Sequence, residues 1–510
     1  MTDKAVREKT MSRALEEVFS DSRDKPCLRI PEGKVWTYGD IEILTRKMLA
    51  ALISYGLSAG DRVLVQTEKS VESVAFYLSC LRLGCIYVPI NTAYTKAEVD
   101  YFIEDADPRL FICQIEREKD FHSVRKRLSL LTLGSQGEGS LMQKVEDYEP
   151  IDRKSNSDPD DVAAILYTSG TTGRSKGAMI TQKNLLTNAN ALVDIWSWSS
   201  EDTLLHALPI FHVHGLFVAL HCVFLSRASA IFLKRFDPSL VADLLSQPNV
   251  SVMMGVPTFY TRLLQDRNLG SRLSNRIRLF ISGSAPLTQA DFSAWEKETG
   301  YKILERYGMT ETGMITSNPV DGERVAGTVG FALPDVEVRI ADDVGNLVGN
   351  GEIGTIEVRG PNVFKGYWRM PAKTSEEFRG DGFFITGDLG VIEANGRVTI
   401  VGRDKDLVIS GGYNVYPKEV ESLIDELDGV KEAAVIGVQH ADFGEGVVAV
   451  IVPEQLDLEL DFVRRSLETK LANYKIPKAI VNVSELPRNV MGKVQKNILR
   501  ERFHDLFDSD

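Results

Sequence analysis

The segment Tyr167-Thr-Ser-Gly-Thr-Thr-Gly-Arg-Ser-Lys-Gly177 lies between two short apolar runs, Val162–Leu166 and Ala178–Ile180. Apolar runs of this length predict buried strands. The segment between them is rich in glycine and hydroxyl groups and ends on basic residues, which suits a loop whose backbone N–H groups surround phosphate oxygens. It does not match the Walker pattern, because neither Gly170 nor Gly173 is followed directly by lysine and then Ser or Thr. On its own the segment is also compatible with a surface hairpin.

The length and composition limit the possible classes of protein. A chain of 510 residues predicts two or more domains. The 59 Lys and Arg against 72 Asp and Glu give a net charge of −13, which disfavours nucleic-acid or anionic-membrane binding. No apolar stretch approaches the ~20 residues of a membrane helix. The N-terminal Met1–Thr10 lacks the apolar core of a secretory signal, although an organellar presequence stays possible.

The five cysteines predict neither a disulfide framework nor a zinc site, because they are scattered, odd in number and without a CxxC pair. They are Cys27, Cys80, Cys85, Cys113 and Cys222. A reducing compartment fits this usage, and we expect a cytoplasmic protein.

The N-terminal third alternates strand and helix patterns. Thr37 and Asp40 form a helix-capping signature before an apolar run at helical spacing. Next come a predicted strand at Arg62–Gln66, a helix at Val71–Leu83 and a strand at Cys85–Ile90. This rhythm predicts an α/β fold of parallel or mixed sheets covered by helices.

Two histidines and one arginine stand near predicted strand ends. His212 and His214 would point to the same side of an extended segment, but no third metal ligand is nearby, so we expect neutral, hydrogen-bonded histidines. Val250–Val256 predicts a buried strand, and Pro257 starts a helix that carries Arg262. Such positions lie close to the ligand-binding edge of a parallel sheet. A solvated arginine is the common alternative.

Polar side chains follow further predicted strands. The small residues Gly283-Ser284-Ala285 would let the backbone approach a flat ligand. After the next strand, Tyr307 could stack on a base, Thr310 could meet a phosphate, and Glu311 could hold Mg²⁺. Asp388 lies just past a predicted strand, where a carboxylate could accept both hydroxyls of a ribose.

We expect a domain boundary near Lys405, within the charged run Val401–Asp406. The residues beyond it predict a compact α+β unit of roughly 100 residues. Its predicted helices are Glu419–Leu427, Leu460–Leu471 and Gln495–Leu506, and its predicted strands are Ala433–Val438 and Val447–Val452. Lys493 follows a glycine in the loop before the last helix, where most lysines are simply solvated.

Taken together, these segments resemble, in order and spacing, the adenylate-forming superfamily of acyl-CoA synthetases, peptide-synthetase adenylation domains and luciferases. The resemblance runs from Tyr38 to Arg500. Within the superfamily, the stretches Leu208–Phe217, Met254–Arg262 and Pro361–Met370 resemble malonyl-CoA synthetases.

The resemblance implies a large N-terminal adenylation core at residues 1–404 and a small mobile α+β domain at 405–510. It also implies two half-reactions in one site: attack of a carboxylate on the α-phosphate of MgATP, then displacement of AMP by the thiol of CoA. The catalytic residues would be Lys493, Thr310, Glu311 and His212, with Glu311 as the magnesium ligand. The small domain would swing about Lys405, bringing Gly411, Gly412 and Tyr413 to the CoA tunnel.

The resemblance implies an ATP site in which residues 168–176 hold the β and γ phosphates, Thr310 touches the α-phosphate, Tyr307 and Gly283–Ala285 flank adenine, and Asp388 and Arg403 hold ribose. The implied ATP and AMP contacts are Thr168, Ser169, Gly170, Thr171, Thr172, Gly173, Lys176, Gly283, Ser284, Ala285, Glu305, Tyr307, Thr310, Asp388 and Arg403.

The implied acid is malonate, whose second carboxylate needs a cation once it is buried. Arg262 is the matching candidate, supported by Ser284 and His212, with Val213 and Met309 beside C2. The expected partners are the small molecules malonate, ATP and CoA. The alternatives are a synthetase for methylmalonate or a monocarboxylate and, in a different class, a non-catalytic nucleotide-binding protein.

Overall fold

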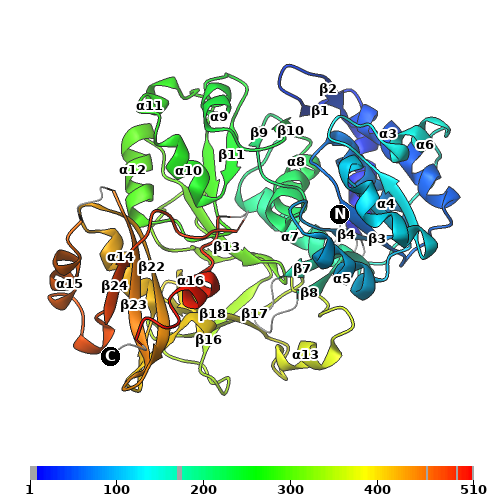
Figure 1. Cartoon of the computed structure of the whole chain (residues 1–510). Helices are drawn as coiled ribbons and strands as arrows, with labels where there is room; N and C mark the ends of the chain where they lie inside the picture. Colours follow the sequence, from blue (N-terminus) through cyan, green and yellow to red (C-terminus); the bar gives the residue numbers. More distant parts are fainter. Residues whose placement is uncertain (1–8, 169–174, 455–457, 490–491, 508–510) are drawn as a thin grey trace.

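The computed structural model describes residues 9–168, 175–454, 458–489 and 492–507. Figure 1 shows a large part that contains the N-terminal and central elements, and a smaller C-terminal unit at one side of it. The expected loop residues Ser169, Gly170, Thr171, Thr172 and Gly173 lie outside the described residues.

A six-stranded sheet holds the first strand–helix units, in the order β6-β5-β3-β4-β7-β8. Its strands are β3 (Arg62–Gln66), β4 (Ile86–Pro89), β5 (Leu110–Cys113), β6 (Ser129–Thr132), β7 (Val162–Thr168) and β8 (Lys176–Thr181). The associated helices are α3 (Tyr38–Ser54), α4 (Val71–Leu83), α5 (Lys96–Ala106), η1 (Ile115–Lys126) and α6 (Ser140–Glu146). All neighbours pair in parallel except β7 and β8, which form an antiparallel hairpin.

A second sheet has nine strands in the order β15-β14-β13-β12-β11-β9-β10-β1-β2. Its strands are β1 (Pro26–Arg29), β2 (Val35–Thr37), β9 (Thr203–His206), β10 (Ser229–Phe232), β11 (Val252–Gly255), β12 (Leu279–Ser282), β13 (Leu304–Met309), β14 (Gly313–Ser317) and β15 (Phe331–Ala332). Its helices are α2 (Met11–Asp21), α7 (Gln182–Ile195), the π-helix η2 (His214–Leu220), α8 (His221–Leu225), α9 (Pro238–Leu245), α10 (Pro257–Leu263), α11 (Leu269–Arg272) and α12 (Gln289–Thr299). The segment from β13 to β1 is parallel.

Helix α4 explains how the two large sheets stack. Every residue of α4 except Glu72 is buried, and its side chains share one core cluster with Val63 of β3 and Leu204 of β9. A helix that is apolar all round must be covered on all sides, so α4 belongs between layers rather than on the surface.

Two smaller antiparallel-rich sheets follow along the chain. The first contains β16 (Glu337–Ala341), β17 (Gly354–Arg359), β18 (Phe384–Ile392) and β19 (Val398–Arg403), with helix α13 (Pro371–Glu376) in the β17–β18 connection. The second contains β20 (Val408–Ser410), β21 (Tyr413–Val415), β22 (Val430–His440), β23 (Gly444–Pro453) and β24 (Ala479–Asn482). The helical segments of the C-terminal unit are α14 (Pro417–Asp425), α15 (Leu460–Glu468), η4 (Asn473–Lys475) and α16 (Lys496–Arg502), after the single turn η3 (Asp404–Asp406).

The predicted fold class, mixed sheets with a large N-terminal and a small C-terminal part, is confirmed. Thr37 and Asp40 form the expected capping box of α3. The predicted strand Arg62–Gln66 and helix Val71–Leu83 have the observed bounds of β3 and α4. The five cysteines are free and buried.

Some local details differ from what the sequence suggested. Asp388 lies inside β18, paired with Arg403 of β19, and not past the end of a strand. His212 and His214 do not sit on an extended segment, because the π-helix η2 begins at His214. The helix predicted at Leu460–Leu471 ends at Glu468, and the one predicted at Gln495–Leu506 ends at Arg502.

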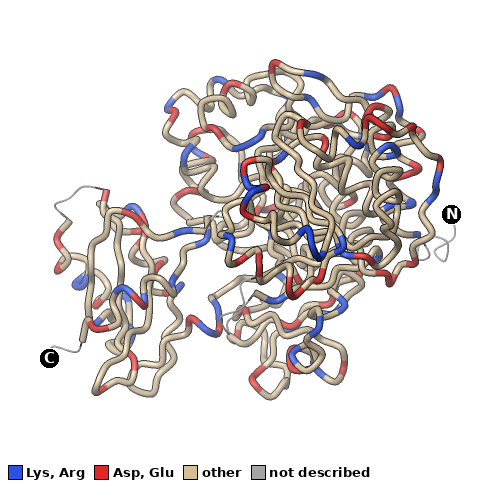
Figure 2. Tube along the Cα trace, turned by 45° about the vertical axis from the view of Figure 1, so that its right-hand side comes forward, with Lys and Arg blue, Asp and Glu red and all other residues tan. Residues whose placement is uncertain are grey.

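The surface carries charges of both signs. In Figure 2 Lys and Arg alternate with Asp and Glu along the large part and along the C-terminal unit. No helix within the described ranges is long and apolar enough to cross a bilayer.

Candidate active site

Most of the predicted nucleotide-site residues lie on strands of three sheets or on the turns that follow these strands. The β7–β8 hairpin supplies Thr168 and Lys176, which face each other in the antiparallel register. The turn after β12 and the strand β13 supply the residues expected around adenine. The β18–β19 pair and a loop of the C-terminal unit supply the remaining site residues.

Lys176 is buried and held by an acidic and aromatic group. Its Nζ lies 2.9 Å from Oε1 of Glu377 and 4.2 Å from the ring centre of Tyr367. The Tyr367 hydroxyl lies within hydrogen-bond distance of two carboxylates, 2.7 Å from Glu377 Oε2 and 3.1 Å from Glu311 Oε1. The lysine is therefore positioned by a carboxylate that an anionic ligand could displace.

Glu311 has the environment of a magnesium ligand. It is buried, and burial raises the pKa of its carboxyl, while hydrogen bonds and Lys176 lower it. Thr168 places its hydroxyl oxygen 3.4 Å from Glu311 Oε1. A carboxylate beside a hydroxyl supplies the oxygen ligands that Mg²⁺ prefers. No group of three or more His, Cys, Asp or Glu side chains suited to a metal occurs in the described part of the chain.

Tyr307, Asp388 and Arg403 form one hydrogen-bonded unit. The Tyr307 hydroxyl donates to Asp388 Oδ2, and Arg403 Nε lies 2.6 Å from Asp388 Oδ1. The charge of Asp388 raises the pKa of the Arg403 guanidinium. Each Asp388 oxygen has one partner and keeps a further lone pair, so the carboxylate can still accept hydroxyl groups of a sugar.

The turn after β12 has an unusual backbone. Ser284 has φ +71°, a left-handed conformation that costs a non-glycine residue ~1–3 kcal/mol and is often found at functional sites. Gly283 precedes it and Ala285 follows it. On the adjoining strand, Glu305 accepts a hydrogen bond from the Gly327 backbone N–H at 3.1 Å, and burial raises its pKa to about 8.

His212 and His214 are neutral hydrogen-bonding groups, as the sequence predicted. Burial, followed by the charges of Lys493 and Arg306, lowers the pKa of His212 to about 3. Its Nδ1 accepts from the His214 backbone N–H at 3.2 Å, so the ring proton lies on Nε2. His214 Nδ1 lies 3.2 Å from the Ser284 hydroxyl.

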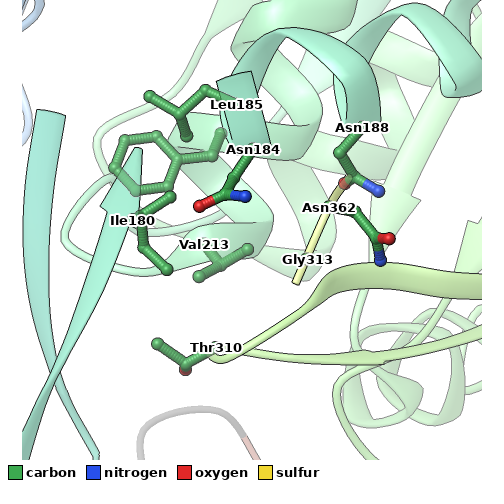
Figure 3. Close-up of a pocket in the computed structure, with 9 residues that line it drawn as sticks. Ile180, Asn184, Leu185, Asn188, Val213, Thr310, Gly313 and Asn362 are labelled. Atoms are coloured by element: carbon green, nitrogen blue, oxygen red, sulfur yellow. The ribbon is translucent and has the colours of Figure 1, made fainter. Parts of the chain in front are cut away.

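Val213 and Thr310 line a small cavity next to the site, together with the asparagines Asn184, Asn188 and Asn362 (Figure 3). Its volume of about 20 Å³ has room for about one water molecule, so it is not the acid-binding site. Asn362 donates to the backbone carbonyl of Thr312 at 2.8 Å, and Asn188 donates to that of Met314 at 2.8 Å. These amides support the loop that carries Thr310 and Glu311. Met309 is half-buried at the end of β13.

The two arginines on the acid side differ from expectation. Arg262 lies on the helix started by Pro257, as predicted, in the last turn of α10. It is exposed, whereas the sequence-based interpretation required a buried cation there. Arg306 of β13, which the sequence analysis passed over, is 3% exposed. Burial lowers the pKa of its guanidinium to about 9.

Lys493 faces this site from the C-terminal unit. Burial lowers the pKa of its ammonium to about 8; Arg403 lowers it further, whereas Asp388 and Glu311 raise it. Lys493 is nevertheless an exposed residue, as expected for a side chain that projects into an open site. Gly492 lets the loop that carries Lys493 lie close to α10, because a Cβ at this position would lie 3.1 Å from Oγ1 of Thr258.

The residues expected at the CoA tunnel lie away from this cluster. Lys405, Gly411, Gly412 and Tyr413 are all exposed. Tyr413 is 60% exposed and its ring stacks on Tyr474 at 4.7 Å. Lys493, by contrast, interacts electrostatically with Arg403, Asp388 and Glu311.

Sequence reasoning missed Tyr367, Glu377 and Arg306. Tyr367 and Glu377 act through contacts with residues far apart in the chain, which no local pattern indicates. Arg306 had a signal: in a strand it shares a face with the core residue Leu304, because side chains two apart point the same way. A charged residue on a buried strand face needs a partner of opposite charge or a hydrogen-bond partner.

Comparison with known proteins agrees with this geometry. The family model described as AMP-binding enzyme matches residues 15–368, and the model described as AMP-binding enzyme C-terminal domain matches residues 419–493. A malonate–CoA ligase of Arabidopsis thaliana is 32% identical, covering 96% of this chain and 90% of its own. An indoleacetate–CoA ligase of Aromatoleum aromaticum is also 32% identical, covering 94% of this chain and 95% of its own.

Among solved structures, ATP-bound MatB of Rhodopseudomonas palustris is 49% identical, with a TM-score of 0.94 over 97% of this chain and 99% of its own. The apo structure of the same protein gives a TM-score of 0.84 over the same coverage. The arrangement described above is thus nearer to the ATP-bound one. With both family models matched in order along the sequence, and a 32%-identical relative that covers 96% of the chain, the chain belongs to the AMP-binding enzyme family.

Proposed function

We propose that the protein is an ATP-dependent malonate–CoA ligase. It converts malonate and ATP to malonyl-AMP and pyrophosphate, and then transfers the malonyl group to CoA with release of AMP. The observation that supports this proposal is the electrostatic interaction of Lys493, from the C-terminal unit, with Arg403, Asp388 and Glu311. A protein that only binds a nucleotide has no need of a lysine delivered from a separate unit.

In the first half-reaction, a carboxylate oxygen of malonate attacks the α-phosphorus of ATP. The new O–P bond forms as the bond to the pyrophosphate oxygen breaks, and negative charge builds on the α-phosphate oxygens. Lys493 and Thr310 stabilise this charge, and loss of one such contact typically costs about 10²–10³-fold in rate. His212, neutral with its proton on Nε2, can donate a hydrogen bond without repelling Lys493.

The remaining nucleotide contacts are assigned from the sequence motifs. The segment 168–176 would bind the β and γ phosphates, once Lys176 leaves Glu377. Tyr307, the Gly283–Ala285 turn and Glu305 surround adenine, while Asp388 and Arg403 bind ribose. Glu311 and Thr168 would hold Mg²⁺, which supplies positive charge to the phosphates.

The second half-reaction needs a different arrangement. The CoA thiol attacks the carbonyl carbon of malonyl-AMP, the C–S bond forms, and AMP leaves. Lys493 occupies the side from which the thiol must come. The unit from residue 405 onward would rotate about Lys405, withdraw Lys493 and bring the Gly411–Tyr413 turn to the site, as hinge motions at a few loop residues allow.

The acid is assigned from charge. Malonate keeps a second carboxylate, and a desolvated carboxylate needs a cationic partner. Arg262 lies one helical turn beyond Thr258, the residue that Gly492 approaches, and would attract this carboxylate at the entrance of the site. Val213 and Met309 would contact C2.

A panel of acids tests the proposal. Pyrophosphate release is measured with and without CoA for malonate, methylmalonate, acetate, propionate and indoleacetate. We expect malonate to be turned over most efficiently and to release pyrophosphate in a single turnover without CoA. A preference for indoleacetate would support a ligase for an aryl acid, the activity in the name of one 32%-identical relative. Absence of pyrophosphate release with every acid would refute ligase activity.

A further inference from the structure

Lys69 is a buried lysine that lies outside the group of site residues described above. It precedes Ser70, the N-cap of α4, and its exposed fraction is 6%. Burial lowers the pKa of its ammonium well below the usual value, and no carboxylate of the described residues raises it. Lysine is almost never fully buried unless it is paired, so the contacts of Lys69 are informative.

The partner of Lys69 is a histidine of the nine-stranded sheet. Its Nζ lies 2.6 Å from Nδ1 of His206, 2.9 Å from the backbone carbonyl oxygen of the same residue and 4.3 Å from the ring centre of Phe232. His206 is the last residue of β9 and is 1% exposed. Burial, followed by the charge of Lys69, lowers the pKa of the His206 ring, so the ring is neutral. Lys69 therefore links the β3–α4 connection to the end of a strand in the other large sheet.

The two contacts of the His206 ring define its tautomer. Its Nε2 lies 2.8 Å from the backbone carbonyl oxygen of Gly215, which can only accept a hydrogen bond, so the ring proton is on Nε2. Its Nδ1 then carries a lone pair and accepts from the amine of Lys69. The partner of one ring nitrogen decides which tautomer the other nitrogen presents, so Lys69 keeps His206 a donor toward Gly215.

Gly215 belongs to the segment that carries the histidines of the candidate site. It is the second residue of the π-helix η2, and His214 is the first. A Cβ at Gly215 would lie 2.0 Å from the backbone oxygen of Pro209, so the start of η2 lies directly against the connection from β9. The bond from His206 to the Gly215 carbonyl therefore holds the backbone beside His214 and, two residues earlier, His212.

We propose that Lys69 and His206 are positioning residues for adenylation, which act through the Gly215 backbone to hold His212 at the reacting end of the acid. This proposal rests on the function proposed above, in which His212 donates a hydrogen bond from Nε2. Lys69 sets the tautomer and orientation of the His206 ring, and the ring fixes the start of η2. Small displacements of a catalytic group are costly, because a shift of about 1 Å can lower the rate by about 10²-fold.

The test uses the full-length protein and measures single-turnover adenylation as pyrophosphate release from ATP and malonate without CoA. Lys69→Met removes the donor and keeps an apolar chain of similar length, and we expect adenylation to slow about 10–100-fold with unchanged ATP affinity. His206→Leu should have a similar effect. His206→Gln can still donate to Gly215 and accept from Lys69, so it should keep most of the rate.

A double-mutant cycle separates positioning from a general structural role. His212→Ala alone should slow adenylation by about 100-fold. If Lys69 acts through His212, adding Lys69→Met to His212→Ala should have little further effect, because residues that act as a unit are not additive. Slowing by the same factor in both backgrounds would overturn the proposal.

His221→Leu is the matched control. His221 is also fully buried and directly follows η2, but its Nε2 lies 2.9 Å from the Tyr77 hydroxyl. We expect this variant to adenylate malonate at a rate close to that of the wild type. A loss as large as that in His206→Leu would show that any defect near η2 slows the reaction, and the specific role of His206 would be refuted.

The comparison of the two His206 variants decides the question if Lys69→Met does not fold. Because both variants remove the imidazole, equal losses in His206→Leu and His206→Gln would contradict the positioning role, whereas a rate retained only in His206→Gln supports it.

The two proposals fail in different ways. If the wild-type protein releases no pyrophosphate with malonate, the proposed function is wrong. If the wild type adenylates malonate and Lys69→Met does so at the same rate, the function stands and the role of Lys69 is refuted.

Discussion

The contact between Gly492 and Thr258 gives a direct test of the docked lysine loop. Gly492 has φ +73°, and a Cβ on it would lie 3.1 Å from Thr258 Oγ1 and 3.2 Å from Thr258 Cγ2. Gly492→Ala therefore introduces two effects: a strained backbone, worth ~1–2 kcal/mol, and a close contact across the two parts of the chain. The backbone strain acts in either orientation of the C-terminal unit, whereas the close contact acts only when Lys493 is docked.

The size of the contact effect follows from these distances. Atoms at 3.1–3.2 Å need a shift of a few tenths of an ångström, which is the low end of the ~1–3 kcal/mol found for overpacking. At 1.36 kcal/mol per tenfold in rate, ~1 kcal/mol slows adenylation about fivefold. Gly492→Val adds two methyl groups at the same place, and ~3 kcal/mol would slow it about 150-fold.

Single-turnover assays separate the two half-reactions. Adenylation is followed by pyrophosphate release from ATP and malonate without CoA, and thioester formation by mixing preformed malonyl-AMP with CoA. Both Gly492 variants should slow the first step more than the second. Thr258→Ala removes the two close atoms and leaves only Cβ, at 3.8 Å, so Gly492→Ala should have little effect on adenylation when made in the Thr258→Ala background.

Two results would refute this reasoning. Equal slowing of both half-reactions by Gly492→Ala would mean that backbone strain alone is responsible. An unchanged effect of Gly492→Ala in the Thr258→Ala background would mean that the loop does not dock on α10 during adenylation.

Three further predictions concern charged residues. Lys493→Ala should reduce malonyl-AMP formation by about 100-fold or more and spare thioester formation from preformed adenylate, since the lysine serves only the first transition state; equal loss of both steps would contradict its role. Because the pKa of Lys493 is lowered to about 8, the ammonium is charged below that pH and neutral above it, so single-turnover adenylation should slow as the pH rises through about 8. Lys493→Arg stays charged over this range, so the decrease in adenylation rate with rising pH should disappear in this variant. A decrease that persists would have another origin. Arg262→Ala should raise the KM for malonate severalfold with little change in ATP affinity, and the effect should be largest at low ionic strength. If the malonate kinetics are unchanged at every salt concentration, Arg262 has no role in binding the acid.

Local sequence determined much of the fold. The capping box at Thr37 and Asp40, the strand Arg62–Gln66 and the helix Val71–Leu83 could be predicted because their information is contained within a few residues: a hydrogen-bonded cap, β-branched apolar runs and helical periodicity. The order of the motifs along the chain was enough to indicate the family, since each motif carries its own residues.

Tertiary structure decided which charges are buried. Arg262 and Arg306 are the same residue type near the same sheet edge, yet α10 leaves Arg262 exposed, and the pairing of β12 with β13 packs Arg306 against Gly283. Likewise, Lys493 and Tyr413 are both exposed residues of the C-terminal unit, but the loop of Lys493 lies against α10, where a Cβ on Gly492 would be 3.1 Å from Oγ1 of Thr258. Burial and electrostatic neighbours depend on contacts between separate segments of the chain, and local sequence patterns do not contain them.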